Sequence, residues 1–170
     1  RMVKNLLALN QLEFGEDDVQ FERFDITSLI SGVLQSLDIL IGQKEAQVIF
    51  RHKNPVYVWA DEFKVEQVVR NYVNNALNHV DGEKVIEIKI TQENDMAKIT
   101  VFNTGTPIPE EDLPHIWEKF YKVDKARTRE YGGNGIGLSI VKAIMDSFGK
   151  GYGAINHTNG AEFWFELDMQ

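Results

Sequence analysis

The segment Gly132-Gly133-Asn134-Gly135-Ile136-Gly137 most constrains what this chain can fold into, because four of its six residues are glycine. A loop with so few Cβ atoms can adopt positive φ angles and bring its backbone close to a ligand. Beyond it, apolar residues recur at helical spacing at Leu138, Val141, Ile144, Met145 and Phe148. The loop is therefore expected to precede a helix N-terminus, where N–H groups and the helix dipole favour a phosphate.

Two common phosphate-binding loops do not fit this segment. A P-loop needs a lysine after its last glycine, but Leu138 and Ser139 follow Gly137 here. A dinucleotide-binding loop directly follows a strand, whereas residues 122–130 are charged and lack a strand pattern. The segment is thus either a third kind of nucleotide loop or a flexible surface loop that caps a helix.

Length and composition narrow the class of protein. With 170 residues the chain suits one domain with a substantial core. Its net charge of −8 argues against a protein dominated by nucleic-acid contacts, so no nucleic-acid partner is expected. It has no cysteine, which excludes disulfides and thiolate metal sites. Because the first residues lie within a helical pattern, we expect a fragment of a longer protein.

The order of apolar periodicities predicts an α+β fold. We expect a two-layer sandwich of three main helices on a mixed, mostly antiparallel sheet, preceded by the tail of another helix. Helices are expected over about 2–14, from a cap at residues 25–28 to Gly42, over 61–80 and after 137. Strands are expected at 20–24, 48–50, 56–59, 86–90 and 97–103, and two more near the end of the chain. A turn is expected at Asn54-Pro55, between the second and third strands.

Two of these elements carry polar residues where solvated or apolar ones would be more usual. Asn71, Asn75 and Asn78, with His79, lie on a narrow helical face beside the apolar stripe. Asparagine is a mediocre helix former, and lysine or glutamate would suit a solvated face better, so we favour a functional role over mere solvation. Asn103 continues the inward row of a strand; it is either a satisfied buried amide or a hydrogen-bonding group at a pocket floor.

Four ordered segments join these features into one pattern. An asparagine box is matched by Asp61 with residues 71–76, and an Asp-x-Gly-x-Gly-Ile box by residues 103–108. A phenylalanine box is matched by residues 117–124 and a second glycine box by residues 133–138. Residues 159–163 are a looser final match. In this order they resemble the ATP-binding catalytic domain of sensor histidine kinases in two-component systems. Within that family the resemblance is to Gram-positive sensors, near the vancomycin-resistance type.

The resemblance implies the Bergerat ATP-binding fold shared with gyrase, MutL and heat-shock chaperone ATPases. It implies that residues 1–15 end the second helix of a dimerisation hairpin. Residues 16–170 would then form the catalytic domain, with a lid over about 120–134. The parent protein is expected to be a homodimer through the missing hairpin, and this fragment a monomer. We expect a cytoplasmic domain of a membrane-anchored bacterial sensor.

The resemblance also implies roles for individual residues. Asn75, assisted by Asn71, would coordinate Mg²⁺ bound to ATP. The catalytic group would be Asn71 with Lys122 and Arg127, which would reach the phosphates from the lid. The other nucleotide contacts implied are Asn78, His79, Asn103, Gly105, Ile108, Phe120, Tyr121, Gly133, Gly135, Ile136, Gly137 and Leu138.

The sequence departs from the family pattern at three positions. Asn103 replaces the aspartate that reads the adenine amino group, Pro107 replaces a glycine, and Asn78 replaces a phosphate-binding lysine. A neutral acceptor contributes roughly 1 kcal/mol less than a charged one. From this difference alone, ATP affinity should be about fivefold below that of an Asn103→Asp variant, with adenine selectivity retained.

The implied function is binding of Mg-ATP and donation of its γ-phosphate to a histidine, for relay to a response regulator. The family's acceptor lies in a His-Asp/Glu-x-x-x-Pro motif, which none of the histidines His52, His79, His115 and His157 has. The acceptor hairpin should therefore lie upstream, and this chain alone should not phosphorylate itself.

Three other classes share features of this chain. An ATP hydrolase of the gyrase or MutL type would want a general-base glutamate where Asn71 stands. An anti-sigma-factor serine kinase shares the fold but usually lacks the leading helical tail. A non-catalytic nucleotide-sensing or interaction module remains an alternative because of Asn78 and Asn103.

Overall fold

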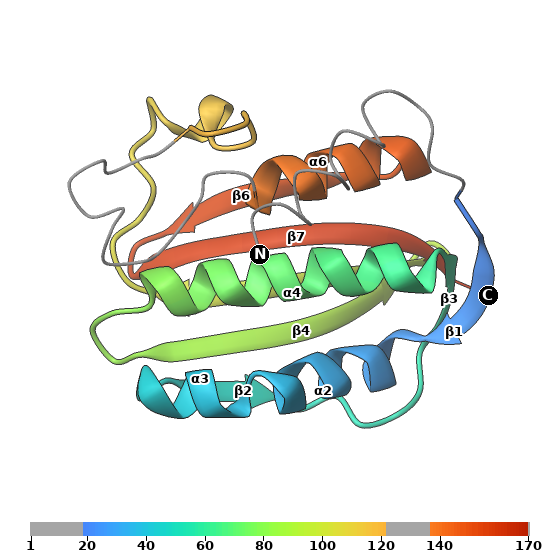
Figure 1. Cartoon of the computed structure of the whole chain (residues 1–170), viewed down its shortest axis with the longest axis horizontal. Coiled ribbons are helices and arrows are strands. Elements are labelled where there is room, and N and C mark those ends of the chain that lie inside the picture. The colour runs from blue at the N-terminus through green and yellow to red at the C-terminus, as the bar shows by residue number, and fades with distance from the viewer. Residues whose placement is uncertain (1–18, 122–136, 170) are drawn as a thin grey trace.

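The structure, a computed structural model, describes residues 19–121 and 137–169. In chain order the elements are β1 (Glu22–Asp25), α2 (Ile26–Ser36), α3 (Asp38–Gln43), β2 (Gln47–Phe50), β3 (Tyr57–Ala60), α4 (Glu62–His79), β4 (Val85–Glu93), β5 (Met96–Thr104), the 3₁₀ turn η1 (Leu113–His115), α6 (Gly137–Phe148), β6 (Tyr152–His157) and β7 (Gly160–Met169). Figure 1 gives their arrangement.

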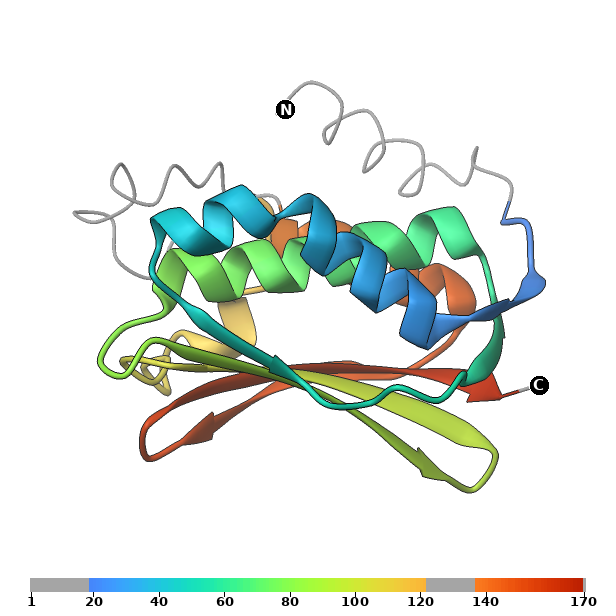
Figure 2. The same ribbon diagram turned by 90° about the horizontal axis from the view of Figure 1, so that it is seen from below.

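The strands form one sheet of seven, in the order β1-β3-β7-β5-β4-β2 with β6 beside β7. The pair of β2 with β4 is parallel, and the other pairs are antiparallel. Helices α2, α4 and α6 lie on one face of this sheet (Figure 2). None of the described helices combines the length and apolar character needed to cross a membrane.

Helix α4 lies between α2 and α6 in the helical layer (Figure 1), and its apolar residues fall on one side, which packs in the core. Asp61 caps its start by accepting a hydrogen bond from the backbone N–H of Lys64 at 3.1 Å. Tyr72 is fully buried, and its hydroxyl donates to the carbonyl oxygen of Trp164 in β7 at 2.9 Å. The buried residues of α4 also include Val65, Val68, Val69, Val73, Ala76 and Leu77.

The predicted α+β fold, with three main helices on a mostly antiparallel sheet, is confirmed. One predicted helix is divided, however: α2 ends at Ser36 and α3 begins at Asp38. At the break, the Ser36 hydroxyl donates to the carbonyl oxygen of Val33 at 2.8 Å and competes with the helical hydrogen bonds there. Between β5 and α6, the helical structure in the described residues is only the 3₁₀ turn η1.

The two strands around Asn54-Pro55 do not form a hairpin. Segment 51–56 instead leads from β2 at one edge of the sheet to β3 near the other (Figure 1). Its end is held at the start of α2, where Asp25 accepts from the N–H of Val56 at 3.1 Å and the Thr27 hydroxyl donates to the carbonyl of Asn54 at 2.9 Å. These long-range bonds, rather than a local turn, direct the chain.

Candidate nucleotide-binding site

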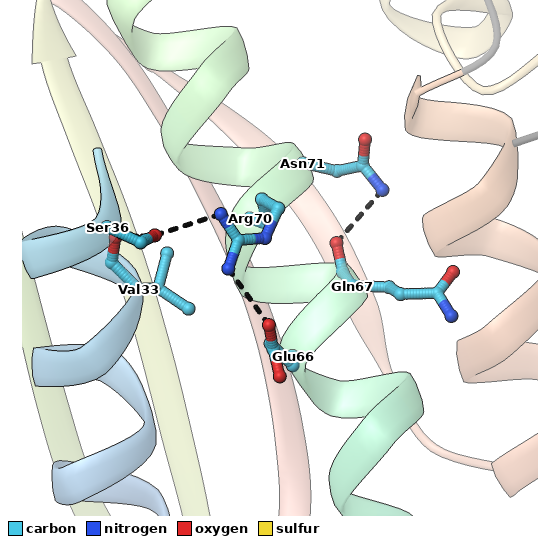
Figure 3. A network of polar contacts seen from close by, with 6 residues as sticks. All are labelled: Val33, Ser36, Glu66, Gln67, Arg70 and Asn71. Atoms are coloured by element: carbon cyan, nitrogen blue, oxygen red, sulfur yellow. Dashed lines mark hydrogen bonds and ion pairs between the residues drawn. The ribbon is translucent and has the colours of Figure 1, made fainter. Parts of the chain in front are cut away.

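One end of the site is the contact between α4 and α6. Nδ2 of Asn71 donates to the carbonyl oxygen of Gln67 at 2.9 Å, one turn earlier in α4 (Figure 3). Its Oδ1 therefore points away from its own helix. A Cβ on Gly137, the first residue of α6, would lie only 3.2 Å from that oxygen. The glycine thus lets the start of α6 approach an amide oxygen.

The asparagines of α4 extend from this contact along the helix. Asn75 and Asn78 follow Asn71 by four and seven residues, which places the three on one side of an α-helix. All three are half-buried, whereas His79 at the helix end is exposed. The three asparagines therefore share one side of α4, as the sequence predicts, and the row runs from the contact with Gly137 to the end of the helix.

The other end of the site is formed by the end of β5. Asn103 is buried, with 2% of its surface exposed. Its Nδ2 donates to the carbonyl oxygen of Thr104 at 3.0 Å. In the described parts of the chain, no side-chain polar atom that is sealed from solvent lacks a partner. Oδ1 of Asn103 takes no hydrogen bond from those parts, which leaves this acceptor without a donor among the described residues.

Close backbone contacts hold the residues around Asn103. A Cβ on Gly105, whose φ is +148°, would lie 2.7 Å from the carbonyl oxygen of His79. A Cβ on Gly160 would lie only 2.0 Å from the carbonyl oxygen of Asn103. The end of α4, the end of β5 and the β6–β7 turn can meet here only because both positions are glycine.

Two residues that the sequence did not single out complete this end. Asn156 of β6 accepts from the N–H of Ile108 at 2.8 Å and donates to the carbonyl of Ile108 at 2.6 Å. Thr104 binds the connection between α4 and β4 through its hydroxyl, which donates to the carbonyl of Asp81 at 2.8 Å. Thr104 lies inside a recognised motif, but no local pattern points to Asn156, which is 48 residues from its partner.

The aromatic pair at the start of the expected lid has different surroundings. Phe120 is exposed and has a φ of +67°. Tyr121 stacks on His115, with ring centroids 5.3 Å apart, and its hydroxyl donates to the Asp112 carboxylate. That hydrogen bond raises the pKa of Tyr121 to about 12. These contacts of Tyr121 lie within the turn at residues 112–121.

Five predicted site residues lie outside the described residues: Lys122, Arg127, Gly133, Gly135 and Ile136. Leu138, the second residue of α6, is half-buried beside Gly137. The described ranges contain no group of three or more His, Cys, Asp or Glu side chains that could hold a metal ion. Amide oxygens of the α4 row, which suit a hard cation, are the metal ligands that this region offers.

The fold agrees with comparisons with known proteins. Residues 60–170 match the family model described as histidine kinase-, DNA gyrase B-, and HSP90-like ATPase. The chain therefore belongs to this family of ATPases, and the predicted Bergerat fold is confirmed. The structure of the catalytic domain of the histidine kinase ThkA, in a nucleotide-free form, has a TM-score of 0.78 at 28% identity; the match covers 88% of this chain and 95% of that one.

The curated relatives are sensor kinases. The chain is 34% identical over 156 residues to the sensor histidine kinase WalK of Bacillus subtilis, and the match covers 88% of this chain and 25% of WalK. It is 34% identical over 149 residues to the sensor histidine kinase YkoH of the same organism, covering 88% of this chain and 32% of YkoH. The chain thus spans about a quarter to a third of these relatives.

Proposed function

We propose that this chain is the catalytic ATP-binding domain of a sensor histidine kinase: it binds Mg-ATP and donates the γ-phosphate to a histidine on a helical hairpin outside the chain. The observation that carries the proposal is a pair of amides, Asn71 and Asn103, at the two ends of one site. Each has its NH₂ group bound to a backbone carbonyl, which leaves its oxygen as the acceptor for a ligand. Phosphoryl transfer depends mainly on positioning and charge stabilisation, which such fixed groups can supply.

Each end of the site has a distinct task in this proposal. Oδ1 of Asn103 accepts a hydrogen bond from the adenine amino group. Asn75, with Asn71 beside Gly137, presents oxygen to the Mg²⁺ that neutralises phosphate charge. The N-terminus of α6 faces the phosphates, and Lys122 and Arg127 supply the remaining positive charge. Asn78 is uncharged, so more of the phosphate charge is left for Lys122 and Arg127 to neutralise.

The partner in the proposed reaction is a histidine-bearing hairpin, followed by a response regulator. The histidine kinase ThkA has been solved in complex with the response regulator TrrA. That structure has a TM-score of 0.78 at 26% identity, and the match covers 99% of this chain and 48% of that one. By analogy, a response regulator would take the phosphoryl group from the hairpin of the parent protein. The parent would be a membrane-anchored bacterial sensor with this domain in the cytoplasm.

Calorimetry with Mg-ATP tests the first half of the proposal. The chain should bind Mg-ATP, and Asn75→Ala should weaken binding at least tenfold while binding without Mg²⁺ changes little. Asn54→Ala, which changes an exposed asparagine in the connection from β2 to β3, is the matched control and should bind normally. If Asn75→Ala and the unaltered chain bind Mg-ATP with equal affinity, Asn75 does not take part in binding.

Phosphotransfer tests the second half. With labelled ATP, the chain should form acid-labile phosphate on a separately supplied hairpin domain from the parent protein, and none on itself. Steady release of inorganic phosphate without a hairpin would favour the ATP hydrolase. Nucleotide binding without transfer would favour a non-catalytic nucleotide-sensing module.

A further inference from the structure

Base recognition through an asparagine raises a problem that an aspartate does not. A carboxylate can only accept hydrogen bonds, whereas an asparagine amide can turn by 180° and offer either its oxygen or its NH₂ group. A freely turning amide would accept from the amino group of adenine, and would equally donate to the carbonyl oxygen of hypoxanthine. Selectivity for adenine therefore requires that the amide of Asn103 be held in one orientation.

The carbonyl oxygen of Thr104 meets this requirement. It accepts from Nδ2 of Asn103 at 3.0 Å. A turned amide would set Oδ1 against that carbonyl oxygen, leaving two acceptors in contact in a place where 2% of the asparagine is exposed. Burying an acceptor without a donor is costly, so the observed orientation is strongly preferred.

Thr104 is itself held firmly. Its carbonyl oxygen also accepts from the N–H of Asp81 at 2.9 Å. Its hydroxyl donates to the carbonyl of Asp81 at 2.8 Å and accepts from the N–H of Val85 at 3.0 Å. These three bonds join the end of β5 to the connection between α4 and β4, and Thr104 is 5% exposed.

We propose that Thr104 is the positioning residue for base selectivity: its hydroxyl fixes its main chain, and its carbonyl oxygen locks the amide of Asn103 with the oxygen toward the base. The inference rests on the proposed function, because it assigns how the adenine end of that site is read. Thr104 itself does not touch the base in this arrangement.

The test compares Mg-ATP with Mg-ITP, which carries a carbonyl oxygen in place of the amino group. By calorimetry the unaltered chain should prefer ATP by at least tenfold. In Thr104→Val, which keeps the side-chain shape but removes the hydroxyl, the preference should fall to threefold or less. Thr104→Ser, which restores the hydroxyl, should recover most of it. A folded Thr104→Val with an unchanged ATP-to-ITP ratio would overturn the proposal.

A second measurement needs no variant. In ¹⁵N NMR spectra of the unaltered chain without nucleotide, the side-chain NH₂ of Asn103 should show one proton that exchanges slowly with water, the one directed at the Thr104 carbonyl. Fast exchange of both protons would mean that the amide turns, and the proposal would fail. If the unaltered chain binds neither nucleotide, the proposed function fails and the inference falls with it.

Discussion

Oδ1 of Asn71 lies so close to Gly137 that a Cβ on that glycine would be 3.2 Å from the oxygen. The distance is tight enough that a methyl group would displace the amide by a few tenths of an ångström. The position of Gly137 in α6 and the orientation of the Asn71 amide in α4 therefore depend on each other.

Gly137→Ala should therefore weaken Mg-ATP binding, by about three- to tenfold, because the displaced amide no longer presents its oxygen correctly. Gly32→Ala is the matched control: Gly32 lies inside α2 with nothing within 4 Å of a Cβ. That control should bind Mg-ATP normally and be more stable by about 0.5–1 kcal/mol, since alanine favours helix. Calorimetry and chemical denaturation measure both effects; unchanged binding in Gly137→Ala would contradict the assigned contact.

Asn103→Asp should bind Mg-ATP no more tightly than the unaltered chain, and up to about tenfold more weakly. This reverses the expectation from the sequence, which considered only the acceptor for the adenine amino group. A carboxylate gives the adenine amino group an acceptor that is stronger by roughly 1 kcal/mol. Its second oxygen, however, would face the Thr104 carbonyl, repel it and displace the oxygen that meets the base. Calorimetry at neutral pH decides between the two: tighter binding by the variant would show that the carboxylate is accommodated.

Asn156→Ala should weaken Mg-ATP binding several-fold, because it leaves both backbone polar groups of Ile108 without the paired bonds of 2.8 and 2.6 Å. The loop after β5 would then be less well placed beside Asn103. Since both bonds are partly buried, stability should also fall by about 1–2 kcal/mol. Binding by calorimetry at a temperature well below unfolding separates the two effects. If affinity is retained, the clamp on Ile108 serves stability alone.

Tyr72→Phe should lower stability at neutral pH by about 1–2 kcal/mol, because the buried hydroxyl no longer donates to the Trp164 carbonyl. Burial raises the pKa of Tyr72 well above its ordinary value of 10.0. The folded state therefore holds this proton more strongly than the unfolded chain. The corresponding stability is fully present below pH 10 and is lost as the pH rises above it.

Denaturation at pH 8 and at pH 11 measures this dependence. The unaltered chain should lose stability between the two, and Tyr72→Phe should lose less. Tyr57→Phe is the comparison, since Tyr57 is exposed on β3 rather than buried in the core; it should lose as much stability as the unaltered chain. The same fall in stability for Tyr72→Phe as for the unaltered chain would show that another group is responsible.

The sequence predicts the family, the layered fold and the asparagine row because these depend on periodicity and on short motifs. It does not predict the path from β2 to β3, since that depends on bonds from Asp25 and Thr27 to residues far along the chain. The orientation of the Asn103 amide is equally hidden, because it depends on which atom faces the backbone of Thr104. Contacts of this kind exist only after the elements have packed.

The glycine at the start of β7 has a consequence for protein engineering. Because a Cβ on Gly160 would lie 2.0 Å from the carbonyl oxygen of Asn103, the tip of the β6–β7 hairpin packs directly against Asn103 of the candidate site. Chimaeras that exchange the base-reading loop between family members would have to transplant the hairpin tip with it. Insertions of tags or sensors at residues 157–159, although these residues are exposed, would shift the backbone packed behind Asn103.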